Sequence, residues 1–356
     1  RSPTPTSTYF EMKSSHPFTK KFWSEVTSVD NDQVYNTFGS SISVSGDGSL
    51  VAIGSPRSIS SKSPYLTGKV ELFRLSHFPA NSLHQSMQLY WKPIQVFEGE
   101  FDKDEFGHAV ALSNVGTRLV VGAPGFDIIG ESGRTGRVYI YETNLDGIWS
   151  LNQTLDGERS NGDYGFSVAL GVDNVVIGAP YDLNRTGRVY VYKIGENRKW
   201  FQLSQPISGV AVDDLFGWSV ATAYSEQQIL VGAPNDKANS SGYAHLYKFN
   251  KFIDKWSLVN EGFSRKLPGD KFGTSVSQSG DGRIVIIGAP GYDQGKGLTC
   301  IYSRNSSGWH EYGSDILASH EGDELGKSVM ITSEGNRFAI GLPGRGKHVS
   351  MNTGEV

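Results

Sequence analysis

The hydrophobic and polar positions of this chain follow a repeating order of four short segments. In one copy, an aromatic–glycine pair opens the run 106–112, an almost continuous apolar run covers 119–123, and apolar and polar residues alternate over 137–141. A more polar segment that begins with tryptophan follows at 149–155. A short apolar run suits a strand buried on both faces, whereas alternation suits a strand with one packed face. The order therefore predicts four β-strands per copy, with the last strand the most exposed to water.

This order occurs six times, and three markers identify each copy: a tryptophan, an aromatic–glycine pair 15 or 16 residues later (leucine–glycine in the last copy), and a Gly-x-Pro turn. The tryptophans are Trp23, Trp91, Trp149, Trp200, Trp256 and Trp309, and the pairs begin at Phe38, Phe106, Tyr164, Phe216, Phe272 and Leu325. The turns begin at Gly54, Gly122, Gly178, Gly232, Gly288 and Gly341. Self-similarity that returns at a nearly constant interval indicates a propeller or a solenoid.

The two ends of the chain supply complementary parts of one further sheet. The last copy reaches Val356 where its third strand begins, and the Trp23 strand has no first, second or third strand before it. We therefore expect 23–29, with 8–12 as a further candidate, to complete the sheet that 325–356 begins, which removes exposed sheet edges. The predicted fold is an all-β, six-bladed β-propeller of four-stranded antiparallel blades, closed by pairing of the terminal segments. Seven blades is the alternative if the natural chain continues.

Composition and charge narrow the class of protein. Repeats stack into one body, so we expect a single propeller domain over 23–356 after an N-terminal extension over 1–22. The net charge of −4, with both signs interspersed, argues against a nucleic acid partner. No apolar run approaches the roughly 18 residues of a membrane span. The lone Cys300 allows no disulfide within the chain and is expected to be a packed strand residue.

With these motifs the chain resembles the FG-GAP repeat family, whose best-known members form the β-propeller head of integrin α subunits. The resemblance covers about 23–356 and rests on the repeated Phe-Gly, Val-Gly-Ala-Pro and Gly-Arg-Val-Tyr-Val-Tyr segments. It implies a ligand-facing side built from the loops between strands two and three and from the connections between strand four and the next strand one. Integrin-type repeats often carry an Asp-x-Asp-x-Asp-Gly calcium loop, but connections here such as 113–116 and 171–174 offer too few oxygen ligands. We therefore expect no cofactor.

Two acidic series lie on that implied ligand-facing side. One follows the proline of each turn and supplies the weak metal candidates Asp127, Asp182, Asp236 and Asp293. The other precedes the aromatic–glycine pair and comprises Asp104, Asp163, Asp214, Asp270 and Asp323. Short carboxylates of this kind cap tight turns by accepting backbone N–H groups. The competing interpretation is a ring of negative charge around the axial mouth that attracts a cation or a basic ligand.

The loops that differ most between copies are the expected binding loops, because the scaffold repeats and a binding surface does not. They offer four aromatic side chains that we expect to be exposed and four cationic ones. These ligand-binding candidates are Tyr65, Phe126, Tyr181 and Tyr292, with Arg57, Arg134, Arg185 and Arg345. Aromatic and arginine side chains are common at contacts with proteins and glycans.

The functional prediction is a non-catalytic extracellular module for adhesion or assembly that binds a protein partner through loops on one face, in a secreted or cell-surface protein and within a larger polypeptide or assembly. Four glycosylation sequons, at Asn152, Asn184, Asn239 and Asn305, fit this location. The histidines show no metal-ligand spacing, and no Gly-x-Ser-x-Gly elbow or phosphate loop occurs. A glycan-binding, lectin-like propeller and a carbohydrate-active enzyme domain remain as alternatives.

Overall fold

A computed structural model of the chain describes residues 37–59, 65–77, 89–127, 133–224, 227–235, 240–259, 262–265 and 267–344. Regular structure in these residues is β, apart from two four-residue helical segments, α1 (Asp182–Arg185) and α2 (Tyr292–Gly295). Neither of these two described helices is long enough to cross a lipid bilayer. The all-β prediction is confirmed.

The strands form successive antiparallel sheets in chain order. The first contains β1 (Ser41–Val44), β2 (Leu50–Ser55), β3 (Lys69–His77) and β4 (Leu89–Glu98), and the second β5 (Ala109–Leu112), β6 (Arg118–Ala123), β7 (Arg137–Thr143) and β8 (Trp149–Asp156). The third contains β9 (Ser167–Leu170), β10 (Asn174–Ala179), β11 (Arg188–Ile194), β12 (Trp200–Gln202) and β13 (Ile207–Ser208), and the fourth β14 (Ser219–Thr222), β15 (Gln228–Ala233), β16 (Tyr243–Asn250), β17 (Lys255–Leu258) and β18 (Phe263–Ser264). The fifth contains β19 (Ser275–Gln278), β20 (Ile284–Ala289), β21 (Leu298–Asn305), β22 (Gly308–Glu311) and β23 (Ile316–Leu317), and β24 (Val329–Ile331) pairs with β25 (Phe338–Ile340).

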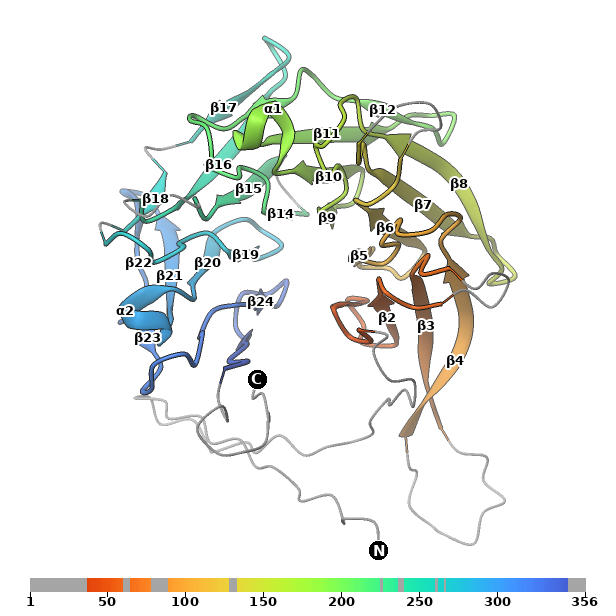
Figure 1. Cartoon of the computed structure of the whole chain (residues 1–356), viewed down its shortest axis with the longest axis horizontal. Helices are drawn as coiled ribbons and strands as arrows, with labels where there is room; N and C mark the ends of the chain where they lie inside the picture. The colour runs from red at the N-terminus through yellow and green to blue at the C-terminus, as the bar shows by residue number, and fades with distance from the viewer. Residues whose placement is uncertain are drawn as a thin grey trace, which may run out of the picture.

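The sheets stand around a common centre, as the blades of a propeller do (Figure 1). The first strands, such as β5, β14 and β24, lie nearest the centre, and the tryptophan-bearing fourth strands lie at the periphery. The segments expected to complete the sheet of β24 and β25, 23–29 and the further candidate 8–12, lie outside the described residues, as do residues 345–356 of the last copy. The number of blades, the closure and the extension over 1–22 therefore stay predictions.

The burial of the strands follows the predicted gradient. The second strands β10 and β15 are buried at every position, whereas the fourth strand β17 is largely exposed. Aromatic side chains of the repeated pairs fill the space between sheets: Phe106 is fully buried among residues of the first and second sheets, and its ring centroid lies 5.1 Å from that of Tyr139. Cys300 is buried in the core of the fifth sheet. These positions confirm that the repeated aromatic side chains and Cys300 serve packing.

The repeated glycines bring neighbouring sheets into contact. A Cβ atom on Gly178 of the third sheet would lie 2.0 Å from the carbonyl oxygen of Gly217 in the fourth. The same approach joins Gly54 to Gly107, Gly122 to Gly165, Gly232 to Gly273 and Gly288 to Gly326. A serine hydroxyl accompanies several of these contacts, as where Ser167 Oγ donates to the Gly217 carbonyl at 2.7 Å. Each copy needs both glycines because side chains at these two positions would separate the sheets.

Candidate functional site

The order of strands in each sheet gives the molecule two different faces. Successive strands alternate in direction, so the loops between strands two and three share one face with the connections from strand four to the next strand one. We call this the connection face. The opposite face, the turn face, carries the hairpin turns between strands one and two and between strands three and four. The described residues of the predicted binding loops and of both acidic series belong to the connection face.

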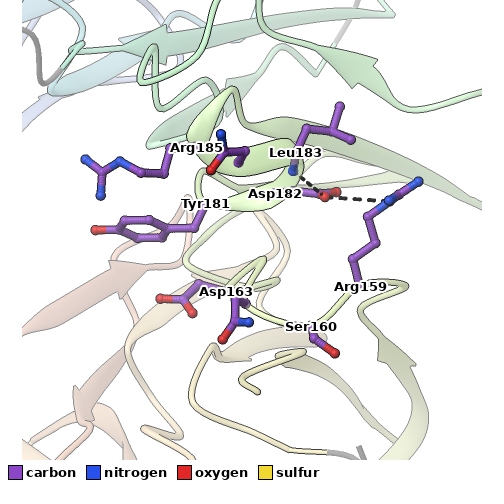
Figure 2. A pocket seen from close by; sticks show the side chains of 9 residues that line it. Arg159, Ser160, Asp163, Tyr181, Asp182, Leu183 and Arg185 are labelled. Carbon is purple, nitrogen blue, oxygen red and sulfur yellow. Dashed lines mark hydrogen bonds and ion pairs between the residues drawn. The ribbon is translucent and has the colours of Figure 1, made fainter. Parts of the chain in front are cut away.

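A pocket of about 690 Å³ opens on the connection face at the third sheet (Figure 2). Its walls are the connection from β8 to β9 and the loop from β10 to β11. The lining residues are Arg159, Ser160, Asn161, Asp163, Tyr181, Asp182, Leu183, Asn184 and Arg185. The pocket thus brings together Tyr181, Arg185 and Asp182 of the predicted site residues, with Asp163 of the second acidic series.

The loop from β10 to β11 forms its wall with an unusual backbone. Leu183, Asn184 and Arg185 follow one another with positive φ angles of 51°, 55° and 67°. Each such non-glycine residue costs on the order of 1–3 kcal/mol, so the surrounding structure must hold it. The Leu183 N–H donates to Asp182 Oδ1 at 2.7 Å, and the Arg185 N–H donates to the Tyr181 carbonyl at 3.1 Å. The segment α2 of the fifth sheet repeats this left-handed turn, which makes the turn part of the scaffold.

The carboxylate of Asp182 is engaged by the scaffold beneath the pocket. Its side chain is only 3% exposed, and Tyr190 donates its hydroxyl hydrogen to Oδ2 at 2.9 Å. Arg188 Nε lies 3.8 Å from Oδ2, and Arg159 Nε lies 3.7 Å from Oδ1 on the solvent side. The negative charge of Asp182 is therefore balanced within the protein.

Asp163 lies at the boundary between copies two and three. Arg134 Nε is 3.4 Å from Asp163 Oδ1, and Arg134 Nη2 donates to Glu105 Oε2 at 2.6 Å. Burial raises the pKa of Asp163 to about 6, and the positive charge of Arg134 partly offsets that rise. Arg134, predicted as a ligand contact, is thus already engaged by two carboxylates.

Other members of the second acidic series cap turns. Asp104 Oδ2 accepts the Phe101 N–H at 2.8 Å, and Asp214 Oδ2 accepts the Ala211 N–H at the same distance. The Tyr243 hydroxyl also donates to Asp214 Oδ2, at 2.8 Å. Both carboxylates are buried. For these two residues the turn-cap interpretation is confirmed.

A row of packed aromatic rings, tilted or edge-on to one another, lies beside the pocket at the inner edge of the connection face. In three of the copies the residue after the glycine of the pair supplies a ring. The ring centroids of His108 and Phe166 are 4.7 Å apart, and those of Phe166 and Trp218 are 4.6 Å apart. Tyr181 continues the row, because its ring lies 6.1 Å from Phe166 and 6.5 Å from Trp218. The sequence analysis missed Phe166 and Trp218, although their shared position after the glycine was a usable signal.

The structure corrects one of the predicted aromatic contacts and qualifies another. Phe126 was expected to be exposed but is only 4% exposed, because the Arg137 guanidinium covers its ring at 3.7 Å. Tyr292 is half-buried against the core of the fifth sheet. Tyr65 is 57% exposed and Arg57 is exposed on the same loop. The predicted contact Arg345 lies outside the described residues.

The three metal candidates that the structure describes do not converge. Asp127 and Asp293 are exposed, and Asp293 accepts a hydrogen bond from Lys296 Nζ at 2.7 Å, whereas Asp182 is buried. Asp236 lies outside the described residues. Across the part of the chain that the structure describes, no three His, Cys, Asp or Glu side chains come together as a metal site would require.

The predicted glycosylation sites differ in accessibility. Asn184 is exposed in the lining of the pocket, and Asn305 is exposed at the turn between β21 and β22. Asn152 is half-buried on β8, and Asn239 lies outside the described residues. Their modification stays a prediction.

Comparison with known proteins supports the family resemblance. Residues 154–192 match the FG-GAP repeat. Integrin alpha-2 of Bos taurus is 30% identical over 172 residues, which cover 43% of this chain and 14% of that protein. Integrin alpha-D of Homo sapiens is 23% identical over 305 residues, which cover 77% of this chain and 26% of that protein. The resemblance to FG-GAP repeat, integrin α-like β-propellers is confirmed, and the chain spans about a quarter or less of these relatives.

A solved structure supports the fold alone. It is a protein of Bacteroides uniformis, provisionally described as a 6-phosphogluconolactonase, with a TM-score of 0.55 and 10% sequence identity. The likeness covers 89% of this chain and 83% of that one. At this identity the similarity supports a shared fold and gives no information about the activity of this protein.

Proposed function

We propose that this FG-GAP repeat, integrin α-like propeller is a non-catalytic adhesion or assembly module, secreted or at a cell surface, that binds a protein partner through its connection face. The observation that carries the proposal is a continuous surface made by the pocket of the third sheet and the adjacent row of packed aromatic rings. Tyr181 belongs to both features. Aromatic and arginine side chains beside a concave surface are typical of the residues that dominate protein interfaces.

Exposed apolar side chains around this surface support protein binding. The connections from strand four to the next strand one expose Phe101, Val210 and Leu267, at 44%, 78% and 55%. These residues precede the buried carboxylates Asp104, Asp214 and Asp270 in the same connections, so rigid turns hold them. Apolar groups rimmed by polar ones are what a partner surface can cover.

The arrangement supports binding rather than catalysis. The two carboxylates of the pocket, Asp163 and Asp182, face the guanidinium groups of Arg134 and Arg188. A general acid and base need carboxyl groups that can exchange protons with a substrate. Asp182 is instead buried and occupied by Tyr190, and we propose that the pair has a structural role.

Glycan binding is the second candidate function, and the lining of the pocket favours it. Ser160 and Asn161 are exposed polar side chains in a pocket that also contains the ring of Tyr181. Hydroxyl and amide groups beside an aromatic ring can hold a sugar. A glycan array separates this candidate from protein binding.

Binding can be tested with two matched variants. The connection-face variant carries Val210→Glu and Leu267→Glu, and the turn-face control carries Val115→Glu and Leu145→Glu. All four side chains are more than half exposed, so both variants should keep the melting temperature of the wild type.

Immobilised protein is exposed to the extracellular proteins of the source organism, and bound proteins are quantified by mass spectrometry. The connection-face variant should lose at least about tenfold of the specifically captured partner, because two buried charges oppose the contact. Equal capture by the wild type and this variant, or loss only in the control, would refute the proposal.

We also propose that six blades close through the segment 23–29. Second strands elsewhere are buried, whereas β25 is largely exposed, and Phe338 on this strand is 39% exposed. This contrast is expected for a sheet that needs further strands. Deletion of residues 1–30 should lower the melting temperature by several degrees more than deletion of residues 1–22. Identical melting of the two truncated proteins would contradict this closure.

A further inference from the structure

We infer that the pocket of the third sheet takes the carboxylate of an acidic side chain from the protein partner, with Arg159 as its principal charged contact. This inference rests on the proposed function and names the chemistry of the group that the pocket selects. It follows from which charges of the pocket are already neutralised, from the position of Arg159, and from the differences between copies of the repeat.

The negative charges of the pocket are neutralised by arginines behind it. Asp182 faces Arg188 and accepts the Tyr190 hydroxyl, and Asp163 faces Arg134. Both carboxylates would have to leave these partners to bind a cation. A basic ligand therefore gains little here, because charged groups that are already paired offer no new Coulomb energy.

Arg159 is the arginine of the pocket with the weakest internal contacts. Its side chain is 54% exposed, and its nearest carboxylate oxygen, Asp182 Oδ1, is 3.7 Å from Nε, which is beyond hydrogen-bond distance. By contrast, Arg185 Nε donates to Asp213 Oδ1 at 2.8 Å, and its guanidinium lies 5.4 Å from the centre of the Tyr181 ring. Figure 2 shows Tyr181 and Arg185 extending together, away from Arg159. The planar guanidinium of Arg159 can therefore pair in bidentate fashion with an incoming carboxylate.

Neutral hydrogen-bond donors stand next to this arginine. Ser160 and Asn161 follow Arg159 in the same connection and are exposed in the lining of the pocket. A hydroxyl and a side-chain amide can donate to the carboxylate oxygens that Arg159 leaves unsatisfied. The positive charge of Arg159 is thus accompanied by neutral donors, as a carboxylate requires.

Comparison of the copies shows that the scaffold does not require an arginine here. Arg159 stands four residues before the half-buried Asp163, and the equivalent positions in the other copies are Glu100, Val210, Lys266 and Ser319. Copy two carries the opposite charge at this place. The acidic residue that ends the connection is repeated, whereas the residue at this place changes from copy to copy, which is expected for a residue that serves recognition.

The row of packed aromatic rings extends the site towards the centre of the connection face. Tyr181 lines the pocket and touches the row at Phe166 and Trp218. A partner segment with an acidic residue in the pocket would place neighbouring apolar side chains on these rings. The partner that fits is a peptide segment in which Asp or Glu adjoins an aromatic or aliphatic residue.

A peptide selection tests this inference with defined probes. A library of random peptides displayed on phage is selected on the folded wild-type protein, and one enriched peptide is then synthesised with its acidic residue intact and as the amide (Glu→Gln or Asp→Asn). Fluorescence anisotropy measures the Kd of both peptides for the wild type, Arg159→Gln, Arg159→Lys and Arg283→Gln. Arg283 is the matched control, because it is 75% exposed on the turn face and has a similarly long ion pair, 3.9 Å from Asp281.

The expected result is enrichment of Asp or Glu, a Kd at least about tenfold weaker for Arg159→Gln or for the amide peptide, and an intermediate Kd for Arg159→Lys, since an ammonium group cannot pair in bidentate fashion. Arg283→Gln should bind as the wild type does.

Selection of no peptides, of peptides without acidic residues, or of peptides that bind Arg159→Gln equally would overturn the inference. Peptides lost in the Val210→Glu, Leu267→Glu variant but insensitive to Arg159→Gln would overturn it while leaving the proposed function in place. Binding of sialylated or sulfated glycans through Arg159, with acidic peptides failing, would overturn the assignment to a protein side chain.

Discussion

Replacement of Gly178 by alanine tests how the sheets are held together. Gly178 lies near the end of β10 and faces the neighbouring fourth sheet. Its φ angle is not positive, so the backbone can accommodate alanine. The added methyl group would nevertheless lie 2.0 Å from the carbonyl oxygen of Gly217 and 2.3 Å from Ser167 Oγ. Ordinary contacts begin at about 3.4 Å, so the third and fourth sheets must move apart by more than 1 Å locally.

The loss in free energy of unfolding caused by Gly178→Ala has two parts. Overpacking of a tight contact costs typically about 1–3 kcal/mol. Separation of the sheets also breaks the hydrogen bond from Ser167 to the Gly217 carbonyl, which contributes roughly 1 kcal/mol. The total, on the order of 2–4 kcal/mol, should lower the melting temperature of a protein of this size by roughly 3 to 5 °C.

Thermal melting by near-ultraviolet circular dichroism is the assay, and Gly147→Ala is the control. Gly147 has a φ of 77° and no heavy atom within 4 Å of an added Cβ, so this variant carries backbone strain without a clash. Its free energy of unfolding should fall by only about 1–2 kcal/mol, which is the energy that a left-handed backbone costs a residue other than glycine. The reasoning is refuted if Gly178→Ala melts within about 1 °C of the wild type, or no lower than Gly147→Ala.

Three further predictions follow from the packing and the buried carboxylates. Burial raises the pKa of Asp104 and Asp270 to about 6, so the folded state binds more protons than the unfolded state between about pH 4 and 6 and stability is lost as pH rises through 6. The melting temperature should therefore be a few degrees higher at about pH 5 than at about pH 7.5, with a smaller difference in Asp104→Asn; an equal slope in both proteins would contradict this assignment. Burial raises the pKa of the Cys300 thiol to about 12, so a maleimide should label it only after denaturation, and rapid labelling of the native protein would disprove its burial. Ser275 Oγ donates to the Gly326 carbonyl at 2.7 Å. Ser275→Ala should therefore cost roughly 1 kcal/mol in a melting experiment, whereas replacement of the exposed Ser306 by alanine should have no effect.

Local patterns account for most of what the sequence determined. The apolar run 119–123 and the alternation of 137–141 predicted β6 and β7 to within two residues, because burial of a strand is a property of consecutive side chains. The repetition predicted that each sheet would contain its strands in chain order. The glycines of the repeated pairs and turns served as markers of each copy, and the structure places them at the contacts between sheets.

Exposure of single side chains was not predictable in the same way. Phe126 follows a turn and was assigned to a binding loop, yet Arg137 folds over its ring from the next strand. Nothing in the neighbourhood of Phe126 along the chain indicates this cover. The pocket likewise needs Arg159 and Tyr181, which belong to two different loops and line the same pocket only because the strands between them turn back in the sheet.

Two members of the acidic series that follows the turns, Asp182 and Asp293, show why exposure cannot be predicted from neighbouring residues. Asp182 begins α1 and reaches the buried Tyr190 hydroxyl, whereas Asp293 stands one position later in α2, where copy three has Leu183. Asp293 is therefore exposed and pairs with Lys296 instead. The sequence alone determined the strands, their order and the turns, since these depend on neighbouring residues. Only the tertiary structure decided which side chains are covered and which share a pocket, because that depends on groups brought together from distant parts of the chain.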